Sequence, residues 1–393
     1  MEKQKCPEIR FNQFNENWSI ISLGDLMNVG SVKRVHQADW CDTGVRFLRA
    51  RDIVAFAKNE DIADPIYISQ DRYEEYSKLS GKVKVGDLLV TGVGTIGVPM
   101  LVGNDDPLYF KDGNVIWFKN ENAINGLFLY YSFINKTIQN FIKDSAGIGT
   151  VGTYTITSGK RTPIYLPKEN EQIQIGNFFQ NLDQSIALHE KKLSQTQNLK
   201  KAMLEKMFPK AGSTQPEIRL KGFSGDWEKK LLDKEVEFFS GLTYSPDDLT
   251  NKNGTLVLRS SNVQDNQIFM DDNVYVVHEA VNVCNVEVGD IIVVVRNGSR
   301  SLIGKHAVIN KQMNNTVIGA FMTGVKAKNP YFINALFDTS LFDVAVSRNL
   351  GATINQITTG MFKQMEFNFP DKTEQIAIGQ FFKQLDETFV LQQ

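Results

Sequence analysis

The sequence has few of the residues that build disulfide frameworks and metal sites. Its three cysteines, Cys6, Cys41 and Cys284, lie far apart, and its four histidines show no ligand spacing. The opening residues include no apolar segment typical of a signal peptide, and the longest apolar runs, such as Ile291–Val295, are too short to span a bilayer. We therefore expect a reduced, cytoplasmic protein that holds no metal.

The chain also lacks a basic excess. It has 43 lysines and arginines against 45 acidic residues, a net charge of −2. Proteins that bind DNA alone usually carry a positive surplus, because phosphate contacts supply much of their affinity. A role in DNA binding would therefore need local basic loops or basic partner subunits. At 393 residues and 42% hydrophobic content, the chain has room for two or three globular domains.

No catalytic constellation is present: there is no Ser/His/Asp or Cys/His set, no Walker loop and no cluster of carboxylates. Gly92, Gly94 and Gly97 form a GxGxxG pattern, but Val98–Val102 continues as a strand, so no helix N-terminus would face a phosphate. The corresponding stretch of the second half, Arg296–Lys305, lacks the pattern. We interpret the glycines as a turn between strands.

Asn329-Pro330-Tyr331 is similar to the (N/D)PP(Y/F) motif of adenine methyltransferases, but one proline is missing. Asn-Pro is also an ordinary helix start, with asparagine as the cap and proline in the first position. The corresponding stretch of the first half, Glu121–Leu127, has no such motif. We therefore expect no methyl transfer by this chain alone, and no catalysis.

An internal repeat is the most informative feature of the sequence. Five segments of the first half recur in the same order in the second half, between stretches that diverge freely. The pairs are Pro7–Trp18 with Pro216–Trp227, Gly44–Ile53 with Gly254–Val263, Val85–Val90 with Val288–Val293, Ile156–Gly159 with Ile357–Gly360, and Glu171–Gln184 with Glu374–Glu387. This pattern indicates one scaffold, used twice, that carries two different surfaces.

Each half begins with a polar arm and a tryptophan, and continues with short β-type runs such as VRFLRARDIVAF and TLVLRSSNV. The apolar spacing predicts one helix over Gly126–Lys143 and another over Pro330–Asn349. Each half is therefore expected to form a mixed α/β (α+β) domain of about 160 to 170 residues.

A long helix is predicted after each domain. The first runs from Glu171 to Phe208, about 57 Å, with Asn170 as its N-cap, and Thr373 is the equivalent cap in the second half. Apolar residues at coiled-coil spacing are expected to pair the helices: Leu182, Ile186, Leu193, Met203 and Met207 in the first, and Phe382 and Leu385 in the second, with His189, Thr196 and Lys200 as polar interruptions. The alternative is packing against the helix's own domain, which the length argues against for the whole helix.

The layout of two divergent α/β domains, each followed by a near-identical helix, resembles the specificity (S) subunit of type I restriction-modification enzymes. Leu182–Pro209 is similar to that family's central spacer helix, and EQIAIGQFFKQLDET to the start of its distal helix. The resemblance implies target-recognition domains at residues 1–169 and 210–372, joined by spacer helices at 170–209 and 373–393. It also implies a pseudo-twofold arrangement with antiparallel helices.

Function and partners follow from the same resemblance. Each domain would recognise one half of a split target in double-stranded DNA, and the helix length would set the distance between the half-sites. Two modification subunits would bind the helices and carry S-adenosylmethionine. Restriction subunits would bring ATP, magnesium and DNA cleavage. The chain itself would hold no cofactor.

The second helix ends at Gln393, where the first still continues through Lys191–Pro209. Antiparallel pairing would then leave the segment around Phe178–Ile186 without a partner, so we expect either that the chain is truncated or that a second molecule supplies the missing segment. We expect weakened docking of the second modification subunit, which a titration showing two sites of equal affinity would refute.

Candidate DNA contacts follow from charge and position in loops, since arginine suits guanine edges and lysine or threonine suits phosphates or bases. They are Lys33, Arg34, Arg49, Arg51, Thr91, Thr95, Arg259, Arg296, Arg300 and Lys305. The alternative is ordinary surface charge, and Arg49 and Arg259 could instead stabilise the domain because both halves retain them.

Two other classes of function stay open at this point. One is an autonomous methyltransferase or nuclease, for which binding of S-adenosylmethionine by the isolated chain would be the evidence. The other is a truncated assembly protein that binds modification subunits but recognises DNA poorly. Gel shifts of the reconstituted complex with specific and random duplexes separate it from a recognition subunit.

Overall fold

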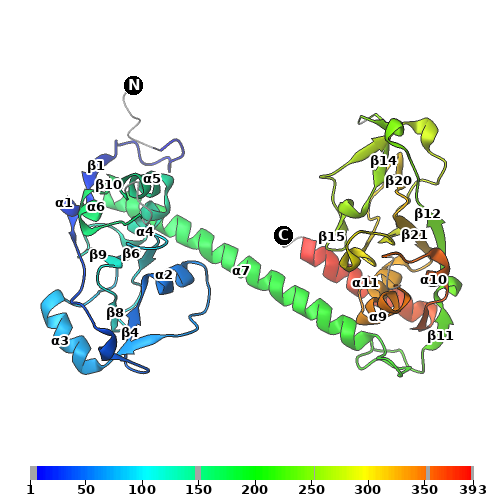
Figure 1. Ribbon diagram of the computed structural model, residues 1–393, viewed down its shortest axis with the longest axis horizontal. Helices are drawn as coiled ribbons and strands as arrows, with labels where there is room; N and C mark the ends of the chain where they lie inside the picture. Colours follow the sequence, from blue (N-terminus) through cyan, green and yellow to red (C-terminus); the bar gives the residue numbers. More distant parts are fainter. Residues whose placement is uncertain (1–6, 147–151, 252, 351–354, 391–393) are drawn as a thin grey trace. The chain divides into compact units, whose positions relative to one another are not determined.

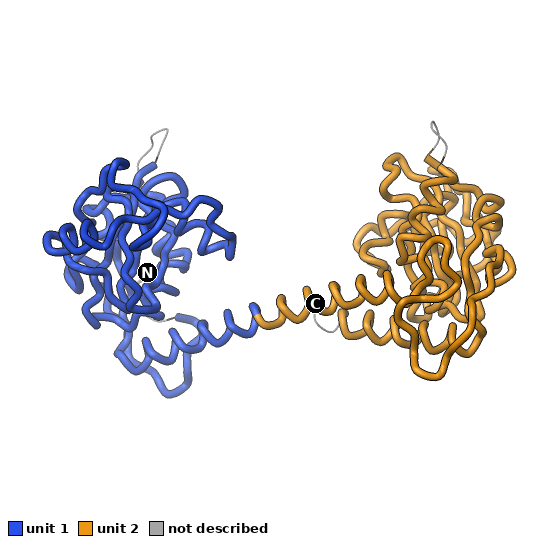
Figure 2. Tube along the Cα trace, turned by 90° about the horizontal axis from the view of Figure 1, so that it is seen from below, with its two compact units in different colours: residues 1–187 blue, residues 188–393 orange. Residues whose placement is uncertain are grey.

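A computed structural model describes residues 7–146, 152–251, 253–350 and 355–390, so Cys6 and Gln393 lie outside the described residues. The chain divides into two compact units, Met1–Ala187 and Leu188–Gln393 (Figures 1 and 2). The division falls inside one continuous helix, α7 (Glu169–Met207), so the expected spacer segment is shared between the units. Within the described residues, no helix is both long enough and apolar enough to cross a membrane.

Unit 1 contains short strands and helices in alternation. They are β1 (Ser19–Ser22), α1 (Leu23–Leu26), β2 (Asn28–Gly30), η1 (Gln37–Asp39), β3 (Trp40–Cys41), β4 (Val45–Leu48), α2 (Ala50–Ala57), β5 (Ile66–Ile68), α3 (Gln70–Ser80), β6 (Leu88–Thr91), β7 (Pro99–Leu101), β8 (Leu108–Phe110), β9 (Val115–Lys119), α4 (Gly126–Ile134), α5 (Lys136–Ser145), α6 (Ile156–Arg161), β10 (Pro163–Leu166) and the start of α7.

Unit 2 repeats the order of the strands, with a short 3-10 helix and a hairpin in the place of α2 and a short 3-10 helix in the place of α3. Its elements after α7 are β11 (Glu228–Leu231), η2 (Leu232–Lys234), β12 (Val236–Ser240), η3 (Pro246–Asp248), β13 (Leu249–Thr250), β14 (Thr255–Leu258), η4 (Ser260–Asn262), β15 (Val263–Gln264), β16 (Gln267–Ile268), β17 (Val274–Val276), η5 (His278–Ala280), β18 (Ile291–Val294), η6 (Arg300–Leu302), β19 (His306–Val308), β20 (Thr316–Ile318), β21 (Met322–Ala327), α8 (Pro330–Phe337), α9 (Ser340–Asn349), α10 (Thr359–Lys363), β22 (Glu366–Phe369) and α11 (Lys372–Val390).

The sheets of the two units correspond strand by strand. An antiparallel sheet has the order β2-β9-β6-β7 in unit 1 and β12-β21-β18-β19 in unit 2. A second sheet has the order β3-β5-β4-β8 and β13-β17-β14-β20, and in each case its last pair is parallel. A two-stranded ladder, β1-β10 or β11-β22, joins the first strand of each unit to its last. The predicted tandem repeat of a mixed α/β domain is therefore confirmed.

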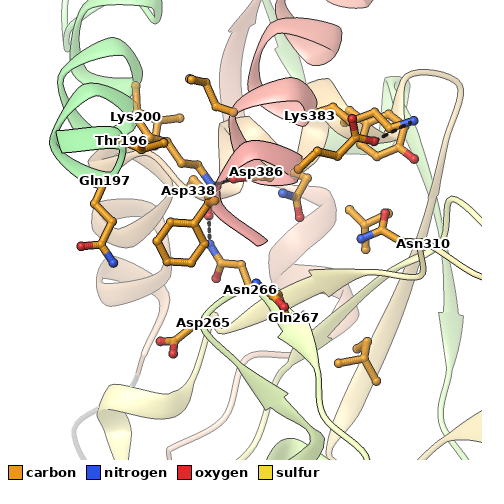
Figure 3. A pocket seen from close by; sticks show the side chains of 18 of the residues that line it. Thr196, Gln197, Lys200, Asp265, Asn266, Gln267, Asn310, Asp338, Lys383 and Asp386 are labelled. Carbon is orange, nitrogen blue, oxygen red and sulfur yellow. Dashed lines mark hydrogen bonds and ion pairs between the residues drawn. The ribbon is translucent and has the colours of Figure 1, made fainter. Parts of the chain in front are cut away.

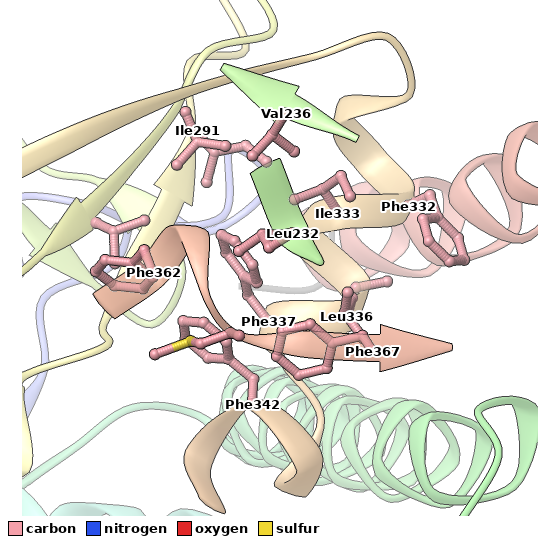
Figure 4. Close-up of a cluster of buried hydrophobic side chains, with 14 of the residues drawn as sticks. Leu232, Val236, Ile291, Phe332, Ile333, Leu336, Phe337, Phe342, Phe362 and Phe367 are labelled. Atoms are coloured by element: carbon pink, nitrogen blue, oxygen red, sulfur yellow. The ribbon is translucent and has the colours of Figure 1, made fainter. Parts of the chain in front are cut away.

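Apolar side chains of the strands and helices form the cores. In unit 2, the largest cluster contains Phe337 of α8 stacked on Phe342 of α9, with 4.2 Å between the ring centroids (Figure 4). The end of α7 joins this cluster through Met207 and Phe208, both 2% exposed. Burying such large side chains contributes about 1.5–3 kcal/mol each, which holds the end of α7 to unit 2.

Several helix boundaries differ from the prediction. Gly126–Lys143 forms two helices, because the side chain of Asn135 accepts a hydrogen bond from the amide of Thr137 and starts a new helix. Pro330–Asn349 is likewise divided, into α8 and α9. The run after Leu48 was predicted as strand but forms α2, whose start is held by Asp52 accepting from the amide of Arg49 at 2.8 Å.

Both predicted caps of the long helices are wrong. Asn170 lies inside α7, since the amides of Glu171 and Gln172 donate to the carbonyl of Lys168. Thr373 lies inside α11, whose cap is Asp371: its carboxylate accepts from the amides of Thr373 and Glu374. Aspartate at this place satisfies amides that have no partner within the helix.

One ion pair recurs in both units and was not predicted. Arg10 binds Glu171 in bidentate fashion at 2.6 and 2.7 Å, and Arg219 binds Glu374 at 2.8 and 2.7 Å. Both glutamates are at most 1% exposed. Each pair ties the polar arm, residues 7–18 or 216–227, to the start of a long helix. The signal was present in the repeated PEIR and EQ segments, which place opposite charges in both halves.

Candidate nucleic-acid interface

In both units some of the candidate contact residues lie where the parallel strand pair ends: Arg49 and Arg51 in unit 1, and Arg259 in unit 2. In unit 1, Arg49 follows β4 and Lys111 follows β8, and parallel neighbours end at the same edge of a sheet. With Arg51, Asp64 and Asn114, they line a hollow of about 490 Å³. This edge therefore concentrates basic side chains that the net charge of the chain does not reveal.

Carboxylates neutralise the arginines of unit 1. Arg49 contacts Asp52 at 2.8 Å and Asp64 at 3.2 Å, and Arg51 also contacts Asp64. The hydrogen bond from Arg49 is the main reason that the pKa of Asp64 lies below its usual value, so the pair stays charged. These contacts give Arg49 a role in holding α2 and the β4 edge together, in line with the alternative interpretation.

The remaining candidates of unit 1 differ in exposure. Lys33 and Arg34 are exposed, and Arg34 contacts Asp112 at 3.2 Å. Thr91 is fully buried, and its hydroxyl donates to the carbonyl of Thr95 at 2.5 Å. Thr95 itself is exposed. Thr91 thus shapes the loop, and Thr95 is the one of the two that a partner can reach.

The glycine pattern lies in the loop between β6 and β7, as predicted. Gly94 and Gly97 have φ angles of +71° and +79°, a conformation that favours glycine. The following strand β7 begins at Pro99, so no helix points its N-terminus into this loop. The pattern is therefore a turn between strands.

Unit 2 carries its arginines differently. Arg259 contacts Asp272 at 2.6 Å, and its amide donates to the side chain of Asn262, which corresponds to the Arg49 arrangement. Arg296, Arg300 and Lys305 lie in the loop between β18 and β19, and all three are exposed. Across the described part of the chain, no carboxylate pairs with these three. The guanidinium of Arg296 instead lies 5.0 Å from the ring centroid of Phe321.

The predicted helix-pairing residues fall into two groups. Leu182 and Ile186, in the unit 1 part of α7, are 45% and 49% exposed. Within unit 2, Met203 and Met207 of α7 share one cluster with Phe382 and Leu385 of α11. Leu193 is half-buried beside the same helices, where it lines a cavity.

Four polar side chains, three of which line that cavity, were not predicted as a group. Lys200 of α7 contacts Asp338 at 2.8 Å and Asp386 of α11 at 2.6 Å (Figure 3). His306 contacts Asp338 at 3.1 Å. Asn266 of the β15–β16 hairpin also donates to Asp338. We call Lys200, Asp338, Asp386 and His306 the charged cluster. Helical spacing indicated Lys200 only as an interruption in an apolar seam.

The contacts within the cluster and its burial shift the pKa values of Lys200, Asp338 and Asp386. Burial alone would lower the pKa of Lys200, but Asp338 and Asp386 outweigh it, and the pKa is raised. Burial would raise the pKa of Asp338, but His306 and Lys200 lower it below the usual value. The pKa of Asp386 is raised, because burial outweighs its contact with Lys200. The cluster thus links α7 and α11 to the end of α8 and to β19 within unit 2.

Comparison with known proteins gives a consistent result. The type I restriction modification DNA specificity domain matches residues 15–198 and again 224–393. A putative type I restriction enzyme specificity subunit from Haemophilus influenzae is 29% identical over 175 residues, 42% of this chain and 41% of the relative. A specificity subunit from Methanocaldococcus jannaschii is 25% identical over 219 residues, 52% of this chain and 48% of the relative. The matches thus span less than half the length of these curated relatives.

The fold is also shared with solved structures. The S subunit of the type I restriction-modification system from M. genitalium superimposes with a TM-score of 0.62, at 15% identity, over 98% of this chain and 93% of that chain. At this identity the likeness concerns the fold alone. The family domain matches both repeated halves, and together the matches cover most of the sequence. The chain therefore belongs to the type I restriction modification DNA specificity family.

Proposed function

We propose that this chain recognises a split target in double-stranded DNA, one half-site per unit, and that it contributes recognition rather than catalysis. The observation that carries the proposal is the identical strand order of the two units combined with different loops at the same sheet edge. Two domains with the same strand order position the corresponding loops in the same way, and loops that carry different side chains select different bases.

The partners follow from the helices. The first part of α7 exposes Phe178, Phe179, Leu182, Ile186 and Leu188, each between 41% and 52% exposed. A stripe of this size commonly marks a protein interface. We infer that it binds modification subunits, which would carry S-adenosylmethionine, and that restriction subunits with ATP and magnesium join that complex.

Mapping methylated adenines after reconstitution with modification subunits tests this proposal. Genomic DNA should carry methyl groups at one split sequence, and duplexes with that sequence should bind at least 1000-fold more tightly than random DNA at fixed salt. Leu182→Ser with Ile186→Ser should weaken subunit binding, whereas Asn177→Ser, on an exposed polar position of the same helix, should not. Equal affinity for specific and random duplexes would contradict DNA recognition.

A further inference from the structure

One turn occupies the same place in both units but carries different side chains. In unit 2 it joins β20 to β21, the amide of Met322 donates to the carbonyl of Gly319, and the carbonyl of Phe321 accepts from the amide of Val295 at 2.9 Å. In unit 1 the turn joins β8 to β9, and the carbonyl of Asn114 accepts from Gly92 at 2.8 Å. Gly92 and Val295 each follow the central strands β6 and β18, so Asn114 and Phe321 are equivalent.

The two side chains at this place are chemically opposite. Phe321 is 51% exposed, and Arg296 covers part of its ring. Asn114 lines the hollow that also contains Arg49, Arg51 and Lys111. Within the described residues, its amide group forms no hydrogen bond to another side chain or to the backbone. Single exposed apolar residues are common, but this one lies at the same edge as the unneutralised arginines.

The surroundings of both residues suit a nucleic acid. Basic side chains beside each position would contact phosphates and bring the turn close to a groove. An asparagine amide donates and accepts, which matches the exposed edge of adenine, whereas a phenylalanine ring suits the methyl group of thymine. A free amide in one unit and an exposed ring in the other therefore fit two different base pairs.

We propose that Asn114 and Phe321 are the specificity-determining base contacts of the two half-sites, Asn114 through hydrogen bonds and Phe321 through apolar contact. This inference rests on the proposed function of DNA recognition. Because the turn is held by main-chain hydrogen bonds, substituting either side chain leaves the backbone contacts intact.

The test uses the complex reconstituted with modification subunits and four duplexes: the full target, each half-site with the other randomised, and a fully random sequence. Asn114→Ala should lower the preference for one native half-site about 10-fold, and Phe321→Ala should do so for the other half-site only. Phe321→Leu, which keeps an apolar side chain, should restore most of the preference. The slope of affinity against salt should stay unchanged, because neither residue contacts phosphate.

Matched controls come from the same chain. Phe56 of α2 is 48% exposed, and Asn140 of α5 is also exposed, so Phe56→Ala and Asn140→Ala remove the same groups elsewhere in unit 1. Neither control should alter half-site preference. Equal losses on all four duplexes, or unchanged preferences, would overturn the inference while leaving DNA recognition intact. A wild-type complex that binds all four duplexes equally would overturn the proposed function and this inference together.

Discussion

The two units share one sheet topology but neutralise their interface charges differently. In unit 1, Arg49 and Arg51 both contact Asp64, so binding to phosphate must compete with internal ion pairs. In unit 2, Arg259 is likewise paired with Asp272, but Arg296 and Arg300 have no carboxylate partner among the described residues. Both copies of the scaffold thus pair the arginine after the parallel strand with a carboxylate, and unit 2 adds unpaired arginines in a loop where unit 1 has threonines.

A second difference lies at the helices. Asp183 and Asp386 are equivalent in the repeated segment, but Asp183 accepts a hydrogen bond from Tyr131 at 2.7 Å, whereas Asp386 contacts Lys200. At this position unit 2 has an ion pair, whereas unit 1 has a hydrogen bond from a neutral hydroxyl group. Removing one partner of a buried ion pair lowers the stability of the fold strongly, so the two units should respond unequally to substitution.

The largest expected effect is from Lys200→Met, which removes the cation shared by Asp338 and Asp386. Loss of the lysine leaves the buried Asp338 with only His306 and Asn266 as partners and removes the cation beside the partly exposed Asp386, and we expect unit 2 to lose about 3 kcal/mol of stability. Hydrogen exchange of peptides from α8 and α11, compared with α4 of unit 1, measures this. Lys201→Met, on the exposed neighbouring position, should have little effect; equal losses from both variants would contradict the role of the cluster.

The same variant makes a pH prediction. Without Lys200, the pKa values of Asp338 and Asp386 should rise. A carboxyl group whose folded pKa is raised stabilises the folded state as pH falls through that pKa. The deficit of Lys200→Met relative to the wild type should therefore shrink as the pH falls from neutral toward acid. A deficit that grows over this range would show that the carboxylates are not the destabilising groups.

The ion pairs between each polar arm and the start of a long helix should affect both units equally, since both units have one. Arg10→Met and Arg219→Met each leave a buried glutamate unpaired, and we expect each unit to lose about 3 kcal/mol. Chemical denaturation followed by hydrogen exchange of β1–β10 and β11–β22 reports the two units separately. A loss confined to one unit would contradict an equivalent role.

Arg51 is paired with Asp64, whereas Arg300 has no carboxylate partner among the described residues. We therefore expect the two arginines to contribute unequally to DNA affinity. Arg300→Ala should weaken binding about 10-fold and reduce the salt slope by about 1 if it contacts phosphate, and should weaken only specific DNA if it contacts a base. Arg51→Ala should have a smaller effect because Asp64 already neutralises it. Gel shifts at three salt concentrations make the comparison, and a larger loss from Arg51→Ala would reverse our interpretation.

The caps of the long helices offer a smaller test. Asp371 caps α11, whereas Lys168 holds the equivalent place before α7. Asp371→Ala should cost about 1 kcal/mol in unit 2, and Lys168→Asp should gain a similar amount in unit 1, less any contribution from the exposed Lys168–Glu16 contact. Thermal unfolding measures both. A stabilised Asp371→Ala variant would show that the cap has no effect.

The smallest effect should come from removing the negative charge of Asp64 beside Arg51. Asp64→Asn frees Arg51 from an exposed carboxylate while Arg49 keeps Asp52, and we expect affinity for random duplex to rise about twofold to fivefold at low salt. The corresponding change in unit 2, Asp272→Asn, frees Arg259 and serves as the matched comparison. An unchanged affinity in both would show that these pairs do not compete with phosphate.

The tandem repeat of domains and helices could be predicted because five segments of the sequence recur in the same order. Two segments that recur 203 residues apart, at Val85 and Glu171, marked equivalent strands and helices before any contact was known. The breaks at Asn135 and between α8 and α9 were not predicted, because apolar spacing continues across them while capping side chains start new helices. Periodicity describes neighbours along the chain. It could not show that Arg10 contacts Glu171, or that Lys200 lies between two carboxylates.

The candidate interface was predicted in part for the same reason. Charge and loop position selected Arg296 and Arg300 but could not separate them from Arg49, whose partner Asp64 lies 15 residues away. Thr91 was selected by its loop and is fully buried. Asn114 and Phe321 were not selected, since neither is charged, and only the main-chain pairing shows that they are equivalent.

The turn that carries Asn114 or Phe321 has a consequence for how such proteins change over generations. Its shape depends on backbone groups alone, so a single codon change there alters the exposed group at little cost to folding. Mutations elsewhere in these sheets would disturb buried apolar packing. New target preferences could therefore arise by one substitution at a time, in one half of the molecule while the other half keeps its preference.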